Sequence, residues 1–113
     1  MHELPVTENL LEIAVRHANN AGAIRILGLH LVIGDLASII DESIQFYWEI
    51  ISKGTLGEGA KLHFKRIPLA MSCDHCGFKY QPSAENLACP SCESGKVTIV
   101  SGKEFFLESI DIE

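Results

Sequence analysis

The sequence contains no long apolar run and few basic residues. In its 113 residues, no apolar stretch approaches the roughly 20 needed to cross a bilayer. The first residues, Met1-His2-Glu3-Leu4-Pro5, lack the basic start and apolar segment of a secretion signal. Nine Lys and Arg stand against fifteen Asp and Glu, for a net charge of −6, which disfavours a nucleic-acid backbone or an anionic membrane as the main partner. We therefore expect a cytoplasmic protein.

Length and composition are those of one small globular protein. Apolar residues make up 47% and charged residues 21%, close to the globular average, so the chain should bury a core. A chain of 113 residues is one compact domain with room for a small satellite. A large enzyme is therefore not expected.

All four cysteines lie in one segment, as two C-x-x-C pairs: Cys73 with Cys76, and Cys89 with Cys92. A disulfide within such a pair closes a very small loop and constrains little, and a reducing compartment opposes it. Two pairs instead suit one tetrahedral ion at Zn–S distances of about 2.3 Å, because each short turn presents two sulfurs from one side. The tight turns that this needs are indicated by Gly77 and by Pro90. The segment predicts a zinc site with four cysteine ligands.

Other uses of the cysteines are disfavoured. Iron can occupy the same sulfur cage, and redox dithiol proteins usually carry one C-x-x-C pair. Four thiolates fill the tetrahedron and leave no position for a water, so the zinc is expected to be structural and not catalytic. His75, inside the first pair, is interpreted as a solvated loop residue because four sulfurs suffice.

Apolar spacing predicts two helices. Residues 5–21 repeat apolar positions at helical spacing, and Gly22 follows as a left-handed terminator. A second helix is expected over residues 41–53, with Asp41 as its cap. Its apolar stripe, which we assign to the core, consists of Ile44, Tyr47, Trp48 and Ile51.

Three further segments predict strands of one sheet. Residues 24–33 are apolar on both faces, as in a central strand. In residues 61–67, Leu62 and Phe64 alternate with polar residues such as His63, which is typical of a strand nearer the edge. Residues 97–100 lead into a last strand over 104–112. The predicted fold is α+β: two helices packed on a small three-stranded sheet, with an inserted zinc-ribbon-like module. The expected domains are residues 1–67 plus 103–113, and a zinc-binding domain over 68–102, which is too small to fold without its metal.

His2 is chemically distinctive because of its position. The α-amine, the first amide nitrogen and the imidazole Nδ1 can close fused chelate rings around one ion, and the amide nitrogen of Glu3 could complete a plane. Such a nitrogen-rich planar site favours Ni(II) or Cu(II) over Zn(II) or Mg(II). By itself a histidine in second position is more often a solvated terminal residue.

The sequence gives no support for catalysis. It shows no Ser/His/Asp or Cys/His arrangement and no Gly-rich phosphate loop, so no catalytic residue is assigned. The remaining histidines, His17, His30 and His63, are each interpreted as packed or solvated side chains.

A zinc ribbon that binds a protein or a nucleic acid, with no nickel role, is the alternative function. Charge weighs against nucleic acid, because a four-thiolate zinc centre adds a formal −2 and no basic groove is expected. Residues 68–102 carry Lys79 and Lys96 against Asp74, Glu85 and Glu93.

Taken together, several motifs in one order resemble a known family. They are Met1-His2-Glu3, Ile33-Gly34, Gly54-Thr55 with Gly59, the two C-x-x-C pairs, Ser101-Gly102, and Ser109-Ile110-Asp111-Ile112-Glu113. The combination resembles the HypA/HybF hydrogenase maturation family nearly end to end.

This resemblance implies a nickel metallochaperone and not an enzyme. Ni(II) would be cargo, carried with a HypB-type GTPase to the large subunit of a [NiFe] hydrogenase. The nickel site would fall on the amine of Met1, the imidazole and backbone nitrogen of His2, and Glu3, through its backbone and as an adjacent acidic group. The structural zinc would fall on Cys73, Cys76, Cys89 and Cys92. Two copies could also pair through exposed sheet edges and form a homodimer.

Overall fold

The computed structural model describes residues 3–82 and 87–113. Met1 and His2, two of the three expected nickel ligands, therefore lie outside the described residues. The chain forms two compact units, one of residues up to 32, 38–65 and 106–113, the other of residues 33–37 and 66–105. The elements, in order, are α1 (Glu3–Asn20), β1 (Ile26–Gly34), the short 3-10 helix η1 (Asp35–Ala37), α2 (Asp41–Ile51), β2 (Lys61–Ile67), β3 (Ala70–Cys73), β4 (Lys79–Tyr80), β5 (Val97–Ser101) and β6 (Phe105–Ile112).

The predicted three-stranded sheet is present, in the order β2-β1-β6. β1 is its central strand and β2 an edge strand, as the sequence predicts. β6 runs antiparallel to β1, because Glu113 exchanges backbone hydrogen bonds with Ile24 and Arg25, just before β1. Gly28 lies beside Lys61, and the ring of His30 lies beside that of His63. Two residues further along β1 therefore lie beside two residues further along β2, so the two strands are parallel. α2 lies in the crossover connection between them.

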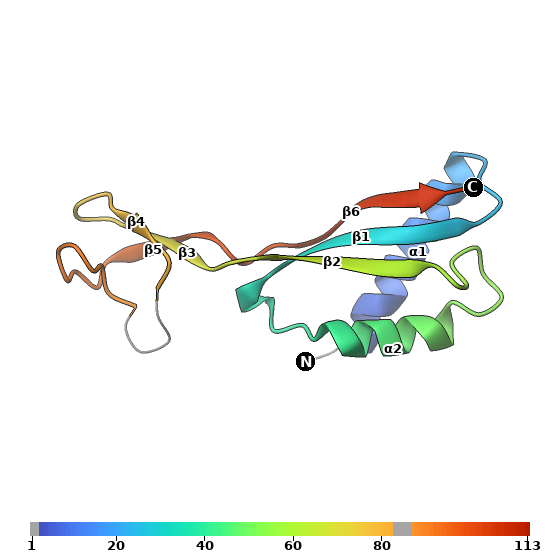
Figure 1. Cartoon of the computed structure of the whole chain (residues 1–113), viewed down its shortest axis with the longest axis horizontal. Coiled ribbons are helices and arrows are strands. Elements are labelled where there is room, and N and C mark those ends of the chain that lie inside the picture. The colour runs from blue at the N-terminus through green and yellow to red at the C-terminus, as the bar shows by residue number, and fades with distance from the viewer. Residues whose placement is uncertain (1–2, 83–86) are drawn as a thin grey trace. The chain divides into compact units, whose positions relative to one another are not determined.

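Both helices lie on the same side of this sheet (Figure 1). Leu29 and Leu31 of β1 are fully buried, and Leu62 of β2 is buried while its neighbours in the strand are exposed or half-buried. From α2, Ile44 and Trp48 are fully buried, whereas Tyr47 and Ile51 are half-buried. The predicted apolar stripe is therefore core along one edge and partly solvated along the other.

The helix ends differ from the predicted ones by up to two residues: α1 ends at Asn20 and not at 21, and α2 ends at Ile51 and not at 53. α1 begins at Glu3, two residues before the predicted start at Pro5; Gly22 follows with φ of 72°, as a left-handed terminator should. The predicted cap at Asp41 is wrong: Ile40 occupies the N-cap position without a side-chain hydrogen bond, and Asp41 is the first helical residue. A carboxylate in the first turn still interacts favourably with the helix dipole, which explains its place there.

The second unit is built on a small antiparallel sheet, in the order β4-β3-β5. Met71 pairs with Tyr80 on one side and with Ile99 on the other. β3 and β4 have no counterpart among the predicted strands. With four and two residues, they are too short to show a hydrophobic period.

Among the described helices, none combines the length and the apolar character that crossing a membrane requires.

Candidate metal centre

Two short turns in the second unit bring the four cysteines together. Cys73 ends β3 and Cys76 lies in the turn toward β4, while Cys89 and Cys92 belong to the turn before β5. The Sγ atoms of Cys73 and Cys92 are 3.5 Å apart, and those of Cys76 and Cys89 are 3.6 Å apart. All four sulfurs lie within 4.8 Å of one another. Sulfurs bound to one zinc at 2.3 Å stand about 3.8 Å apart in a tetrahedron, so the cluster fits that ion.

The two turns share a backbone conformation. Gly77 follows the first pair with φ of 77°, and its N–H donates to the carbonyl of Cys73 over 2.9 Å. Glu93 follows the second pair with φ of 63°, and its N–H donates to the carbonyl of Cys89 over 2.8 Å. The glycine turn is as predicted. The left-handed glutamate is unexpected, because a side chain disfavours this conformation.

The cysteines differ in how readily they ionise. The backbone N–H of Cys76, which lies 3.5 Å from the Cys73 sulfur, is the largest cause that lowers the pKa of Cys73, to about 6. A backbone hydrogen bond from Ser94 lowers the pKa of Cys92, but desolvation and the neighbouring thiols of Cys73, Cys76 and Cys89 outweigh it and raise this pKa to about 12. Four thiolates so close together therefore need a compensating cation.

His75 lies outside this cluster. Its side chain is exposed, and among the described residues the group of metal-ligating atoms contains only the four cysteine sulfurs. The interpretation of His75 as a solvated loop residue agrees with this position.

The structure describes one residue of the expected nickel site, Glu3. This residue is 8% exposed. Its carboxylate and its carbonyl each accept a hydrogen bond, and its backbone is helical. Its Oε2 accepts a hydrogen bond from the backbone N–H of Ile40 over 3.3 Å. Its carbonyl accepts one from the Thr7 hydroxyl over 2.6 Å, and its peptide lies in the first turn of α1. The side chain and the carbonyl of Glu3 are thereby anchored in the first unit.

A second group of metal-ligating side chains, in the first unit, was not predicted. His30, His63 and Asp111 each place one ligand atom within 4.8 Å of the others. His30 and His63 are 33 positions apart in the chain, so the sequence predicts a separate role for each. The available signal was the alternation in residues 61–67, which places His63 on the outer face of the predicted sheet.

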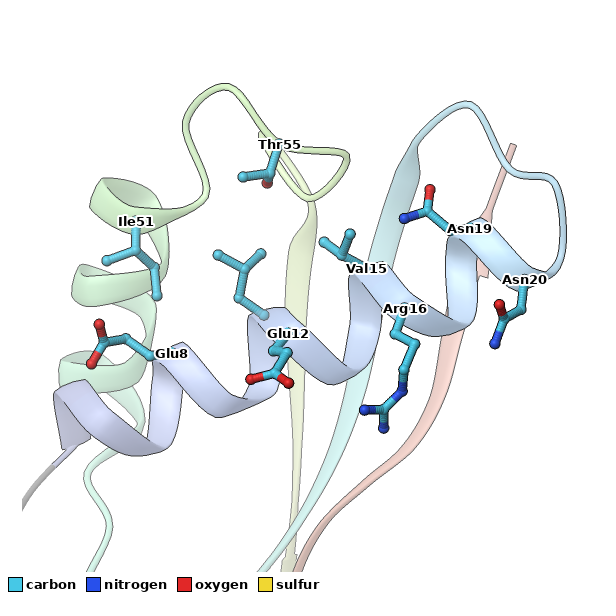
Figure 2. Close-up of a pocket in the computed structure, with 9 residues that line it drawn as sticks. Glu8, Glu12, Val15, Arg16, Asn19, Asn20, Ile51 and Thr55 are labelled. Atoms are coloured by element: carbon cyan, nitrogen blue, oxygen red, sulfur yellow. The ribbon is translucent and has the colours of Figure 1, made fainter.

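A groove of about 730 Å³ in the first unit has a different character. Side chains of α1 line it together with Ile51 of α2 and Thr55 of the following loop (Figure 2). It has an apolar floor, and Glu8, Glu12 and Arg16 lie at its rim. Since its lining holds neither cysteine nor histidine, it does not bear on the metal chemistry.

Sequence comparison covers the whole chain. Residues 1–112 match the family described as HypA, hydrogenase/urease nickel incorporation, metallochaperone. A hydrogenase maturation factor HypA of Dehalococcoides mccartyi is 39% identical over 113 residues, covering 100% of this chain and 95% of the relative. The factor of the same name from Caldanaerobacter subterraneus is 38% identical over 114 residues, with 100% of both chains covered.

Solved structures share the fold. The solution structure of the Ni metallochaperone HypA from Helicobacter pylori has a TM-score of 0.67 at 23% identity, covering 99% of this chain and 97% of that one. A second structure, titled as the solution structure of HypA protein, has a TM-score of 0.75 at 24% identity, covering 100% and 97%. With helices, sheets and the four-cysteine cluster in place, and with the match over residues 1–112, the chain belongs to the HypA family of hydrogenase/urease nickel-incorporation metallochaperones.

Proposed function

We propose that this protein binds Ni(II) at its N-terminus and delivers it for maturation of the [NiFe] hydrogenase large subunit. The proposed nickel ligands are the amine of Met1, the imidazole and backbone nitrogen of His2, and the backbone nitrogen of Glu3. The family match over residues 1–112 carries the proposal. The ligand chemistry adds to it, because fused chelate rings with deprotonated amides select Ni(II) or Cu(II).

The surroundings of Glu3 support its backbone nitrogen over its carboxylate as the nickel ligand. The carboxylate is buried and accepts the N–H of Ile40, so binding an ion through it would break that contact. The backbone nitrogen lies in the first turn of α1, where N–H groups have no acceptor within the helix. The positive end of the helix dipole also favours the negative charge of a deprotonated amide. The carboxylate then acts as an adjacent acidic group.

For the four-cysteine cluster we propose structural Zn(II), bound by Cys73, Cys76, Cys89 and Cys92. The sulfur separations of 3.5 and 3.6 Å fit a tetrahedral ion, and zinc bound there would neutralise half of the thiolate charge. Four protein ligands leave no open position. The bound ion would therefore hold the two turns together and not act on a substrate.

We assign a separate role to each of the two predicted domains. Residues 1–67 plus 103–113 would bind and release nickel, and residues 68–102 would form the zinc-binding domain. We propose a cytoplasmic carrier with a HypB-type GTPase and the hydrogenase large subunit as partners, and neither a nucleic acid nor a membrane. Pairing of two copies through the β2 or β6 edge stays a prediction.

A nickel titration of the tag-free, zinc-loaded protein tests the proposal. We expect one tightly bound Ni(II) with the d–d absorption of a planar nitrogen-rich site. His2→Ala should abolish this band and leave the zinc content unchanged. His17→Ala is the matched control, because His17 is an exposed residue of α1, and it should bind nickel as the unmodified chain does.

The opposite result would favour the alternative function. If the planar nickel band were absent, or indifferent to His2→Ala, the nickel assignment would be wrong. The remaining interpretation would be a zinc-ribbon protein that binds either another protein or a nucleic acid. Binding to nucleic acid that weakens steeply with salt would identify the latter.

A further inference from the structure

The outer face of the three-stranded sheet carries a cluster drawn from all three strands. His30 comes from β1, His63 from β2 and Asp111 from β6. On β1, Leu29 and Leu31 on either side of His30 are fully buried against the helices. Because side chains alternate along a strand, His30 points to the face that the helices leave open. His63 and Asp111 are exposed on that same face.

The three side chains converge closely. The rings of His30 and His63 are stacked, with centroids 4.6 Å apart and planes 9° apart. The Nε2 of His30 lies 2.8 Å from the Oδ2 of Asp111. His63 makes no hydrogen bond to another residue within the described part of the chain, so at least one imidazole nitrogen is available to a ligand.

The spacing suits a single ion. Nitrogen and oxygen ligands bind Zn(II) and similar ions at about 2.0 to 2.2 Å, so two of them on one ion stand about 3 to 4 Å apart. The ligand atoms of this cluster lie within 4.8 Å of one another. Because the two imidazole planes are stacked and their nitrogen lone pairs lie in those planes, the exposed His63 ring would turn out of the stack to share one ion with His30 and Asp111.

Gly28 makes room for the cluster. A Cβ at this position would lie 3.0 Å from the Oδ2 of Asp111 and 3.5 Å from the Nε2 of His63, and 3.2 Å from the backbone oxygen of Lys61. A glycine inside a strand commonly marks a close approach by another group. Here it lets a carboxylate and an imidazole from the two edge strands meet over the central one.

We propose that His30, His63 and Asp111 form a second, solvent-accessible site for a borderline divalent transition ion such as Ni(II), Co(II) or Zn(II). Two imidazoles and one carboxylate are donors that these ions accept. Water would complete the coordination, so the ion would exchange readily. The site shares no residue with the cysteine cluster or with the proposed N-terminal nickel site.

The test uses the zinc-loaded full chain with a few residues added before Met1, which blocks chelation by the terminal amine. Co(II) is titrated while backbone amide NMR signals are recorded. We expect paramagnetic broadening centred on residues 28–31, 62–64 and 110–112. His63→Gln and Asp111→Asn should each weaken Co(II) binding by at least about tenfold, since each removes a ligand.

His17→Gln is the matched control. It makes the same chemical change at an exposed histidine of α1 and should leave Co(II) binding unchanged. Two independent ligand variants guard against a folding defect in either one. If 1 mM Co(II) failed to broaden the signals of this face, or if both ligand variants bound as the control does, the site would be refuted. Neither result bears on nickel binding at the free N-terminus.

Discussion

Zinc removal should unfold the second unit and leave the first folded. The reason lies in how buried apolar residues are distributed. Of the sixteen in the described chain, twelve belong to the first unit and four to the second. Those four are Ile33, Met71 and two of the proposed zinc ligands, Cys73 and Cys89.

The magnitudes favour the metal as the main stabilising term. Burial of Ile33 and Met71 contributes about 3 to 6 kcal/mol together, at about 1.5 to 3 kcal/mol each. Structural zinc in a comparable small module contributes about 10 to 16 kcal/mol near neutral pH. Without the ion, the raised pKa of Cys92 and the lowered pKa of Cys73 mean that one sulfur stays protonated while another ionises.

Hydrogen exchange measured by mass spectrometry would show this, comparing the zinc-loaded protein with protein stripped of zinc in the presence of a reductant. Peptides that cover β3 and β5 should exchange at least about a hundredfold faster after stripping, because loss of about 3 kcal/mol of opening free energy suffices for that factor. Peptides that cover α2 should not change. Cys92→Ser should reproduce the effect, and Ser91→Ala, beside it, should not.

The reasoning would be refuted if β3 and β5 kept their protection in protein that elemental analysis shows to be free of zinc. Equal acceleration in α2 would refute it in another way, because the two units would then unfold together.

Four further predictions concern single changes. Nickel affinity should fall between about pH 8 and pH 5.5, because the amine and the His2 imidazole, whose ordinary pKa is near 6.5, must both be deprotonated to bind; a flat affinity, followed by competition with a chelator, would contradict the site. Residues added before Met1 should abolish planar nickel binding and leave zinc in place, as measured by absorption and elemental analysis. Glu93→Gly should tighten zinc binding about fivefold, because relief of a left-handed side chain is worth about 1 kcal/mol; Glu93→Ala, which removes the carboxylate but keeps the Cβ, should not. Gly34→Ala should destabilise the zinc-loaded protein by about 3 kcal/mol or more, because its Cβ would overlap the carbonyl of Gly102, and calorimetry would give the shift in unfolding temperature.

The sequence was most informative where one local signal decided the structure. Helical spacing predicted α1 and α2 to within two residues at each end, and the apolar segment over residues 24–33 predicted the central strand. Two C-x-x-C pairs predicted the four-sulfur cluster. In each case burial or ligand chemistry acts on neighbours in the sequence, so a short window contains the cause.

Features that depend on distant contacts were missed. β3 and β4 pair because the turn of the first cysteine pair folds them together, and their six residues show no period of their own. The cluster of His30, His63 and Asp111 exists because strands far apart in the chain are neighbours in one sheet. The first turn of α1 was missed because Pro5 looked like a start, whereas Glu3 is held by Ile40, 37 positions away.

The pairing of sulfurs in the cysteine cluster affects how the purified protein must be handled. Two close sulfur–sulfur separations run between the two turns, from Cys73 to Cys92 and from Cys76 to Cys89. If the metal is lost in air, oxidation should therefore link one turn to the other. In such a chain the first unit would stay folded, while the disulfide-bonded sulfurs could no longer take up zinc. A sample stored without reductant could thus pass a size or shape check and still give a false negative in every later metal titration.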